Sequence, residues 1–504
     1  MGTLGRLLQL RVLDLGRTQV DNNSLENICT SSIPLVSLNL SHCKKITSIS
    51  TIASLTALEE LNIDNCCNVT SGWNVFGTLH QLRVATLSNT RINDENIRHV
   101  SECKSLNTLN LAFCKDITDV TALSKITMLE ELNLDCCPNI RKGIETLGKL
   151  PKARILSMKE CYMGDGYAQQ CSILGNSKSL VKLNLERSMG FISVKALSNI
   201  ATLEELVLDH AQEVCCIPSF SCLPRLRVLN LKYTDINGDV TKNISESKSL
   251  RSLNLSHCKW VTDISVLSSL STLEELNVNC CNGIKKGWES LGKLPLLRVA
   301  ILSDTNITAK DIACLSSCKT LVKLKFFWCE KLSDVTVVYK IQSLEELIGR
   351  SCSHGLQGLN ALDTLPRLLF LLLPNLRCRD ISVESIGTSK SLGRLHIEMC
   401  EELTDATPLS NITSLEELSL RNYGEPPEGV GTLGKLPRLK SLYLDLSDIS
   451  NSALNDIFLS RSITSLNLAS SWKLTDISHI SNLTGTGGIE SERMLPHNFR
   501  LGST

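Results

Sequence analysis

The chain repeats one pattern of apolar and polar positions from end to end. Its clearest copy is the 71-residue stretch Leu250–Thr320, which divides into three segments of 23, 24 and 24 residues. Each segment places apolar residues at its positions 1, 4 and 6, as Leu250, Leu253 and Leu255 do in the first. Successive side chains of a strand point to opposite faces. The pattern therefore predicts a short strand whose positions 4 and 6 turn inward and whose positions 3, 5 and 7 turn outward.

Segments of this kind begin at twenty places, namely residues 10, 35, 58, 82, 106, 129, 153, 180, 203, 226, 250, 273, 297, 321, 344, 368, 392, 415, 439 and 463. One unit is too short to bury its apolar face alone, but stacked copies bury a continuous core. The sequence thus predicts an α/β fold, a leucine-rich repeat solenoid. We expect a curved horseshoe or arc with a parallel concave sheet and short convex helices or turns. The predicted array covers residues 1–483, and an irregular, disordered tail covers 484–504.

The repeats cycle through three types, which differ in the segment after the strand. The first type carries a Thr/Ser-Asp pair, such as Thr262-Asp263, whose carboxylate can accept hydrogen bonds from the amides of a convex turn. The second type opens with Leu-Glu-Glu-Leu and closes on a Leu-Pro step, and proline ends the convex segment. The third type, seen at residues 94–105, has apolar residues at helical spacing after polar capping residues, which predicts a short helix.

Cysteine is abundant, but its placement is regular. Of the 22 cysteines, ten occupy position 9 of a repeat: Cys43, Cys66, Cys114, Cys137, Cys161, Cys258, Cys281, Cys329, Cys352 and Cys400. This regularity indicates a ladder of buried thiols in a reducing compartment rather than a disulfide framework. Adjacent pairs such as Cys136-Cys137 place one thiol inward and one outward, which does not supply four convergent zinc ligands.

Charge and candidate chemistry exclude several functions. Lys plus Arg and Asp plus Glu both number 52, so no basic field points to nucleic acid. No run of 18 apolar residues predicts membrane insertion, and no secretory signal is recognised, so we expect an intracellular protein, cytoplasmic or nuclear. Ser-His-Cys at 41–43 and 256–258 lacks an orienting third group, and no phosphate-binding glycine loop occurs. The sequence therefore predicts no enzyme, no metal site and no cofactor.

The two ends differ from the repeats. Residues 1–9 look like the tail of a second-type repeat, and the pattern stops after Leu483. Solenoids need terminal caps, so the sequence predicts either a truncated or frame-altered copy of a longer protein, or ends covered by a partner or an unrecognised cap. Uncapped ends would also favour self-association.

The repeat cores resemble the cysteine-containing class of leucine-rich repeats. The triplet containing LEELNLDCC, KKGWESLGKLP and LRVLNL is similar to leucine-rich repeat proteins of African trypanosomes. These include the expression-site-associated family described as regulators of adenylate cyclase, and the resemblance covers roughly residues 1–483. It implies an intracellular scaffold with a regulatory role toward a membrane adenylate cyclase. Relatives can carry a zinc-binding RING module, whose spacing this sequence lacks. Two alternatives are a substrate-recognition part of a ubiquitin ligase without its own RING module, and a truncated, non-functional paralogue.

The predicted concave face changes character along the chain. Position 5 is Asn in nine repeats, whereas apolar, aromatic and charged residues take the outward positions from repeat 321 onward. The predicted protein-binding residues are Phe327, Ile348, Arg350, Phe370, Leu372, His396 and Tyr443, with Lys323, Lys325, Arg394 and Glu398 beside them. Exposed aromatic groups beside Arg are typical of binding hot spots. The alternatives are drift in a decaying copy, or a register slip in repeat 368. In each Leu-Glu-Glu-Leu motif the second Glu points outward. These outward Glu residues form a stripe that we interpret as solvated rather than as a site for basic partners.

Overall fold

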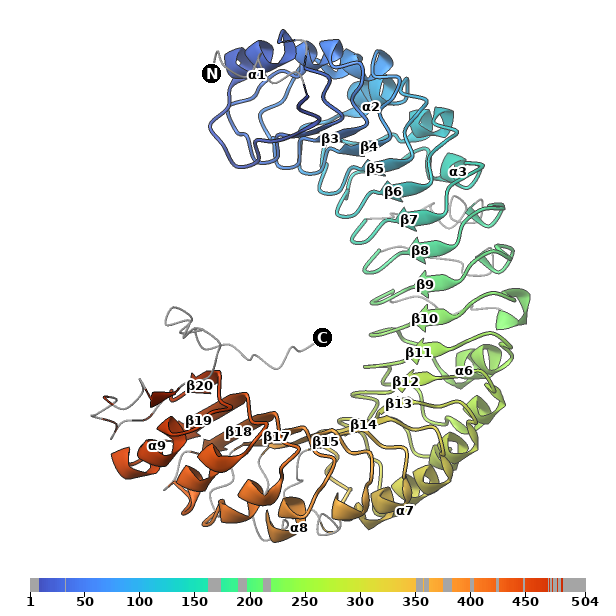
Figure 1. Cartoon of the computed structure of the whole chain (residues 1–504). Coiled ribbons are helices and arrows are strands. Elements are labelled where there is room, and N and C mark those ends of the chain that lie inside the picture. The colour runs from blue at the N-terminus through green and yellow to red at the C-terminus, as the bar shows by residue number, and fades with distance from the viewer. Residues whose placement is uncertain are drawn as a thin grey trace. The chain divides into compact units, whose positions relative to one another are not determined.

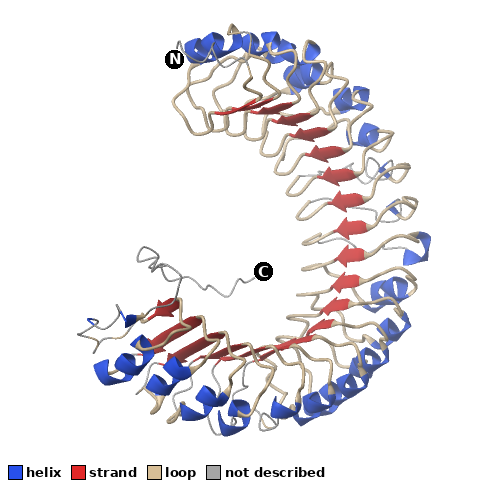
Figure 2. Ribbon diagram, viewed as in Figure 1, coloured by secondary structure: helices blue, strands red, loops and turns tan. Residues whose placement is uncertain are grey.

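Short parallel strands, each followed by a helix or turn, build the chain in a computed structural model (Figures 1 and 2). The structure describes residues 9–31, 33–161, 174–188, 197–211, 219–349, 357, 362–374, 383–398, 403–422, 426–446, 449–469, 471, 474, 478 and 482–483. These residues fall into two compact units, 1–290 and 291–504. Each of the twenty predicted repeats contains one strand, which confirms the leucine-rich repeat pattern.

In the first unit, every strand has three residues and lies parallel to the next strand along the chain. Corresponding positions are in register, so that Leu38 lies between Leu13 and Leu61. The strands are β1 (Val12–Asp14), β2 (Ser37–Asn39), β3 (Glu60–Asn62), β4 (Val84–Thr86), β5 (Thr108–Asn110), β6 (Glu131–Asn133), β7 (Ile155–Ser157), β8 (Lys182–Asn184), β9 (Glu205–Val207), β10 (Val228–Asn230), β11 (Ser252–Asn254) and β12 (Glu275–Asn277).

In the second unit, strands of the same parallel kind become longer. They are β13 (Val299–Ile301), β14 (Lys323–Phe326), β15 (Glu346–Gly349), β16 (Phe370–Pro374), β17 (Arg394–Glu398), β18 (Glu417–Asn422), β19 (Ser441–Leu446) and β20 (Ser465–Asn467). The register is continuous here too, because Leu371, Leu395 and Leu418 lie opposite one another on neighbouring strands. No slip occurs in repeat 368.

Helices and 3₁₀ turns cover the other face of the sheet in each unit (Figure 2). The α-helices are α1 (Asn22–Cys29), α2 (Asp94–Val100), α3 (Ile144–Leu147), α6 (Gly238–Ser245), α7 (Ala309–Ile312), α8 (Val383–Gly387) and α9 (Asn451–Phe458). Side chains of Asp21, Asn93, Asn237 and Ser450 cap α1, α2, α6 and α9. The short helix predicted within 94–105 is confirmed and spans Asp94–Val100.

The 3₁₀ turns are η2 (Ser50–Ser54), η3 (Trp73–Gly77), η4 (Thr121–Lys125), η5 (Phe220–Cys222), η6 (Ser265–Ser269), η7 (Trp288–Lys293), η8 (Ala313–Ser317), η9 (Thr336–Lys340), η10 (Leu362–Thr364), η12 (Thr407–Asn411) and η13 (Val430–Lys435). The carboxylate of Asp263 accepts a hydrogen bond of 2.8 Å from the amide of Ser265, at the start of η6. Asp119, Asp334 and Asp405 do the same for the residue two places on. This confirms the role predicted for the first-type Asp.

The core consists of positions 1, 4 and 6, with position 9 beneath them. Leu250, Leu253 and Leu255 are all buried, as the pattern predicted. The described ladder thiols are buried as well, and each donates a hydrogen bond to the position 6 carbonyl of the preceding repeat. Burial raises the pKa of Cys66 to about 11 and that of Cys161 to about 12. Cys352 and Cys400 lie outside the described residues.

Asn at position 5 has a structural role that we did not predict. In all nine repeats its side-chain oxygen accepts a hydrogen bond from the backbone amide two residues later, as in Asn254 with Ser256. This local bond forms an Asx turn that bends the chain out of the strand. Position 8 then adopts left-handed backbone in every repeat from 10 to 321, with φ between 49° and 62°. The polar stripe of Asn is therefore part of the turn.

Candidate functional site

The open face of the sheet, formed by positions 3 and 5, widens in the second unit. Each strand with Asn or Asp at position 5 has only three residues. The strands longer than three residues are β14 to β19, and their position 5 is Lys325, Ile348, Leu372, His396, Ser419 and Tyr443. Loss of Asn does not by itself lengthen a strand, because β4, β7, β9 and β13 also have three residues although their position 5 is Thr86, Ser157, Val207 and Ile301. The longer strands present a larger continuous surface.

Two parallel rows of side chains cross this surface. The position 3 row is Lys323, Glu346, Phe370, Arg394, Glu417 and Ser441, and the position 5 row is Lys325, Ile348, Leu372, His396, Ser419 and Tyr443. Within each row, consecutive residues lie opposite one another on neighbouring strands, about 4.8 Å apart. We call the part of these rows on β16 to β19 the second-unit patch.

Four predicted binding residues lie on this patch. Phe370, Leu372, His396 and Tyr443 are half-buried on the open face, the side of the sheet on which strand alternation places them. That they bind a partner stays a prediction. Phe327 is only 5% exposed and Ile348 only 8%, so the prediction that both would be exposed was wrong. Arg350 lies outside the described residues.

The two errors have different physical causes. Phe327 stands at position 7, after β14 has ended, where its ring lies against Trp328 and beneath the Lys325 ammonium group, 5.1 Å from the ring centroid. Position 7 is buried in several other repeats, including Ser256 and Ser303, so strand alternation does not extend to it. Ile348 is in register between Lys325 and Leu372, whose side chains flank it.

Phe370, Arg394, His396 and Glu417 form one connected group in the patch. The rings of Phe370 and His396 meet edge to face, with centroids 5.3 Å apart. The guanidinium carbon of Arg394 lies 4.7 Å from the Phe370 ring centroid. His396 Nε2 lies 2.8 Å from a carboxylate oxygen of Glu417. These contacts hold the aromatic ring, the imidazole and the guanidinium in fixed positions.

Sequence reasoning missed the ion pairs that frame the patch. Arg421 donates a hydrogen bond of 2.9 Å to Asp445, across the paired strands β18 and β19. Lys323 and Glu346 approach to 2.7 Å on β14 and β15. A signal was present in each case, namely opposite charges at the same position of consecutive repeats.

The outward Glu of the Leu-Glu-Glu-Leu motif is not simply solvated. In four repeats it contacts the residue at the same position of the preceding strand. The pairs are Ser37 with Glu60, Lys182 with Glu205, Ser252 with Glu275, and Lys323 with Glu346. Glu417 instead contacts His396, which stands two residues beyond its register partner Arg394. One acidic stripe residue, Glu417, therefore belongs to the patch itself.

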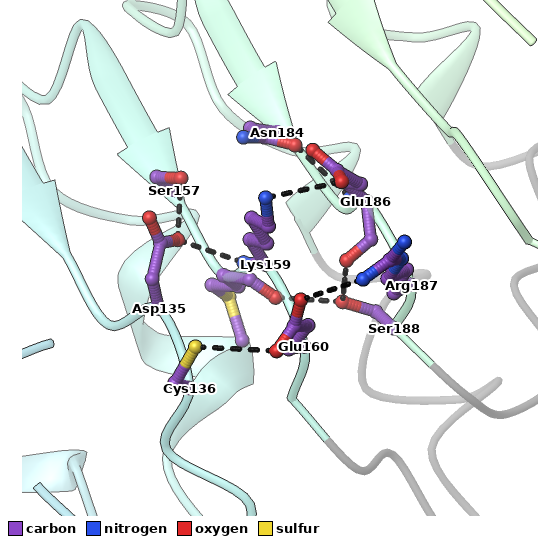
Figure 3. Close-up of polar contacts among 10 residues, drawn as sticks. Asp135, Cys136, Ser157, Lys159, Glu160, Asn184, Glu186, Arg187 and Ser188 are labelled. Carbon is purple, nitrogen blue, oxygen red and sulfur yellow. Dashed lines mark hydrogen bonds and ion pairs between the residues drawn. The ribbon is translucent and has the colours of Figure 1, made fainter. Parts of the chain in front are cut away.

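A second polar cluster follows β6 to β8 in the first unit (Figure 3). Asp135 accepts hydrogen bonds from the Ser157 hydroxyl and from the Lys159 amide, at 2.6 and 2.8 Å. The Lys159 ammonium lies 3.1 Å from Glu186, and next to this pair Arg187 lies 3.2 Å from Glu160. Figure 3 thus shows two ion pairs across consecutive turns, with the Asp135 carboxylate held by a hydroxyl and a backbone amide.

The turns after β9 to β11 continue this cluster with aromatic rings. Tyr233 stacks between His210 and His257, with centroid distances of 4.3 and 3.9 Å. Beside them, Asp209 is 8% exposed, and its Oδ1 has no hydrogen-bond partner. Burial and, secondarily, Glu186 raise the pKa of Asp209 to about 6.

The candidate nucleophile and metal motifs do not assemble a site in the described residues. Cys43 and Cys258, from the two Ser-His-Cys motifs, are buried and donate to the carbonyls of Leu15 and Leu231. Among the residues that the structure describes, no group of three or more His, Cys, Asp or Glu could hold a metal ion. In the same part of the chain, no helix is long and apolar enough to span a membrane.

Comparison with known proteins supports the fold and gives partial relatives. No family model matches the chain. It is 30% identical over 201 residues to a Trypanosoma equiperdum protein named "Putative adenylate cyclase regulatory protein", covering 40% of this chain and 30% of that protein. It is 24% identical over 289 residues to an Arabidopsis thaliana protein named as a disease resistance protein, covering 55% and 23%. The chain spans less than a third of the length of these curated relatives.

Solved structures resemble the chain over most of its length. The TLR13 chain of a TLR13–ssRNA13 complex matches with a TM-score of 0.60 at 20% identity, covering 92% of this chain and 75% of that one. The functional domain of InlJ from Listeria monocytogenes, whose description mentions a cysteine ladder, matches with a TM-score of 0.50 at 15% identity, covering 73% and 74%. The chain has the leucine-rich repeat fold.

Proposed function

We propose that this leucine-rich repeat chain is a protein-interaction scaffold whose partner binds the second-unit patch. The observation that carries the proposal is the change at position 5. Asn, which closes the turn in nine repeats, is absent from seven consecutive strands, β13 to β19. Apolar, aromatic or ionisable residues replace it in six of these strands, and Ser419 replaces it in β18. The three that lie on the patch, Leu372, His396 and Tyr443, stay half-buried there rather than in the core.

The arrangement of the patch suits binding of a protein. Aromatic residues and Arg are enriched at the energetic centres of interfaces, and Phe370, Arg394 and Tyr443 supply both. Phe370 already contacts His396 and Arg394 in the free protein, and these contacts restrict the side chains of Phe370 and Arg394. Less side-chain entropy is then lost when a partner binds.

The partial relative supports a regulatory role inside the cell. The Trypanosoma equiperdum relative, which is 30% identical over 40% of this chain, is named for regulation of adenylate cyclase. On that basis we propose that the partner belongs to an adenylate cyclase pathway. Free, buried ladder thiols fit a reducing compartment such as cytoplasm or nucleus.

The test compares proximity labelling by the wild-type chain with labelling by two variants, expressed at equal levels. Phe370→Ala with Tyr443→Ala removes the centre of the patch. Phe113→Ala is the matched control, because Phe113 is an aromatic residue 52% exposed on a turn of the first unit. We expect one or more proteins to be labelled by the wild type and the control but not by the double variant. Identical labelled sets from all three chains would refute the proposal.

A further inference from the structure

Two cations on the open face of the second unit have no carboxylate partner within the described part of the chain. Among the residues that the structure describes, Lys323, Arg421 and Lys440 are each paired with a carboxylate, at 2.7, 2.9 and 2.8 Å. Lys325 and Arg394 instead contact aromatic rings, those of Phe327 and Phe370. An aromatic face attracts a cation but does not neutralise its charge.

Lys325 is an ammonium group in an apolar frame. Ile301 and Ile348 lie in register on either side of it, and Phe327 lies beneath it. The side chain is half-buried, and this burial lowers the pKa of Lys325. Removing a cation from water is unfavourable unless an anion compensates it. A carboxylate that reached Lys325 would interact with it in a medium of reduced dielectric, where the attraction is stronger than in water.

Arg394 is exposed and lies over the Phe370 ring, with its guanidinium carbon 4.7 Å from the ring centroid. The carboxylate opposite it in register, Glu417, is already hydrogen-bonded to His396 at 2.8 Å. The acidic residue on the strand of Arg394 itself, Glu398, stands four residues further along. The planar guanidinium therefore has N–H groups available for a carboxylate from outside.

The spacing of the two cations defines the partner further. Lys325 stands at position 5 of β14 and Arg394 at position 3 of β17. They are three strand steps apart, about 14 Å, and offset by two residues along the strands, about 7 Å, so their Cα atoms are about 16 Å apart. At about 3.4 Å per residue, about four to five residues of an extended chain span this distance. Between the two cations lie the apolar residues Ile348, Leu372 and Phe370, of which Ile348 is only 8% exposed. Glu346 stands beside them on β15, and its carboxylate is paired with Lys323.

We infer that this face binds an extended acidic segment of a partner protein, with two side-chain carboxylates about four residues apart and apolar residues between them. The inference rests on the proposed function and specifies the chemistry of the partner. One carboxylate pairs with Lys325 and the other with Arg394, while the intervening residues cover Ile348 and Leu372.

The test uses synthetic peptides as probes and the full chain as receptor. Three fluorescein-labelled peptides, amidated at the carboxyl end, carry the cores Glu-Leu-Val-Leu-Glu, Gln-Leu-Val-Leu-Gln and Lys-Leu-Val-Leu-Lys. Fluorescence anisotropy at low and high salt gives their affinities. We expect the acidic peptide to bind about tenfold or more tightly than the Gln peptide, and to weaken with salt. The Lys peptide should be weakest.

Receptor variants locate the binding on the two cations. Lys325→Met and Arg394→Met should each weaken the acidic peptide about tenfold and leave the Gln peptide nearly unchanged. Lys440→Met is the matched control, because Lys440 is exposed and already paired with Glu416. Thermal unfolding of each variant establishes that it folds. Equal binding of acidic and Gln peptides, absence of acidic-peptide binding up to about 1 mM, or insensitivity to both substitutions would overturn the inference.

Failure of this inference differs from failure of the proposed function. If proximity labelling depends on Phe370 and Tyr443 but the acidic peptide shows no preference, the scaffold function stands and the partner chemistry is wrong. If labelling is identical for the wild type and the double variant, the proposed function itself fails, whatever the peptides do.

Discussion

Cys258 and Thr234 share one hydrogen-bond acceptor, the backbone carbonyl oxygen of Leu231. Cys258 Sγ lies 3.1 Å from this oxygen, and Thr234 Oγ1 lies 2.5 Å from it. The same arrangement recurs for Thr90 with Cys114 at the Leu87 carbonyl, and for Thr305 with Cys329 at the Leu302 carbonyl. Because a carbonyl oxygen has two lone pairs, Thr of a third-type repeat and Cys of the next repeat both have a partner. Position 9 therefore links consecutive layers of the array.

Removing one ladder thiol should destabilise the protein locally. Cys137→Ala should lower the free energy of unfolding by about 1–3 kcal/mol, because it leaves a cavity and removes one of the two hydrogen bonds that the Leu111 carbonyl accepts. Cys137→Ser should cost less, since Ser188 at the same repeat position donates to the Met158 carbonyl at 2.6 Å. Chemical denaturation measures both. Cys67→Ala, at a half-buried thiol outside the ladder, is the control, and a loss as large as that of Cys137→Ala would contradict a special role for the ladder.

Thiol reactivity should separate the cysteines by position. Burial raises the pKa of Cys66 to about 11 and that of Cys161 to about 12, so both stay almost fully protonated at pH 8. We expect a thiol reagent to modify exposed Cys222 quickly and these ladder thiols only after denaturation. Peptide mapping after timed labelling provides the measurement. Rapid modification of Cys66 in the native protein would show that the ladder opens on the time scale of the assay.

The sequence predicted the fold because one physical rule repeats twenty times. Apolar residues at positions 1, 4 and 6 must be buried, and a single repeat cannot bury them. The sequence-based predictions failed where side-chain contacts, rather than strand alternation, determine whether a residue is buried or paired. Position 7 follows the strand, so Phe327 became buried although alternation placed it outward. The Asx turn at Asn254 and the pairing of His396 with Glu417 depend on which neighbours meet across a turn or a strand pair. The strand register identifies such pairs only once the ends of the strands are known.

The buried carboxylate of Asp209 should make stability depend on pH. Its pKa is raised from an ordinary value near 3.8 to about 6 in the folded protein, so the folded state binds this proton more tightly than the unfolded chain. The stabilising contribution is fully present below pH 3.8 and is lost as pH rises through about 6. Asp209→Asn should therefore stabilise the protein by about 1–3 kcal/mol at pH 8 and give little gain near pH 4.

The control for this prediction is Asp135→Asn in the neighbouring turns. Asp135 accepts hydrogen bonds from Ser157 and from the Lys159 amide, so its carboxylate is satisfied where that of Asp209 is not. Its replacement should destabilise the protein by about 1 kcal/mol at pH 8. Denaturation curves at several pH values compare the two variants. A wild-type stability that does not change between pH 5 and 7 relative to Asp209→Asn would show that Asp209 titrates normally.

The second-unit patch, rather than the acidic stripe as a whole, should carry the affinity for a protein partner. Phe370→Ala and Tyr443→Ala should each weaken binding by about 2 kcal/mol or more, because desolvated aromatic groups dominate interfaces. Neither side chain belongs to the buried core, so the midpoint of unfolding should change little. Reversal of Glu60, Glu131 and Glu205, all in the first unit, should mainly alter the association rate and its salt dependence.

Glu417→Gln separates binding by the patch from binding by the acidic stripe, because Glu417 is a stripe residue hydrogen-bonded to His396 in the patch. We expect it to weaken binding although the triple reversal does not, and surface plasmon resonance with the partner found by labelling measures both. If the triple reversal abolished binding while both aromatic truncations left it intact, the stripe would be the site and the patch a product of drift.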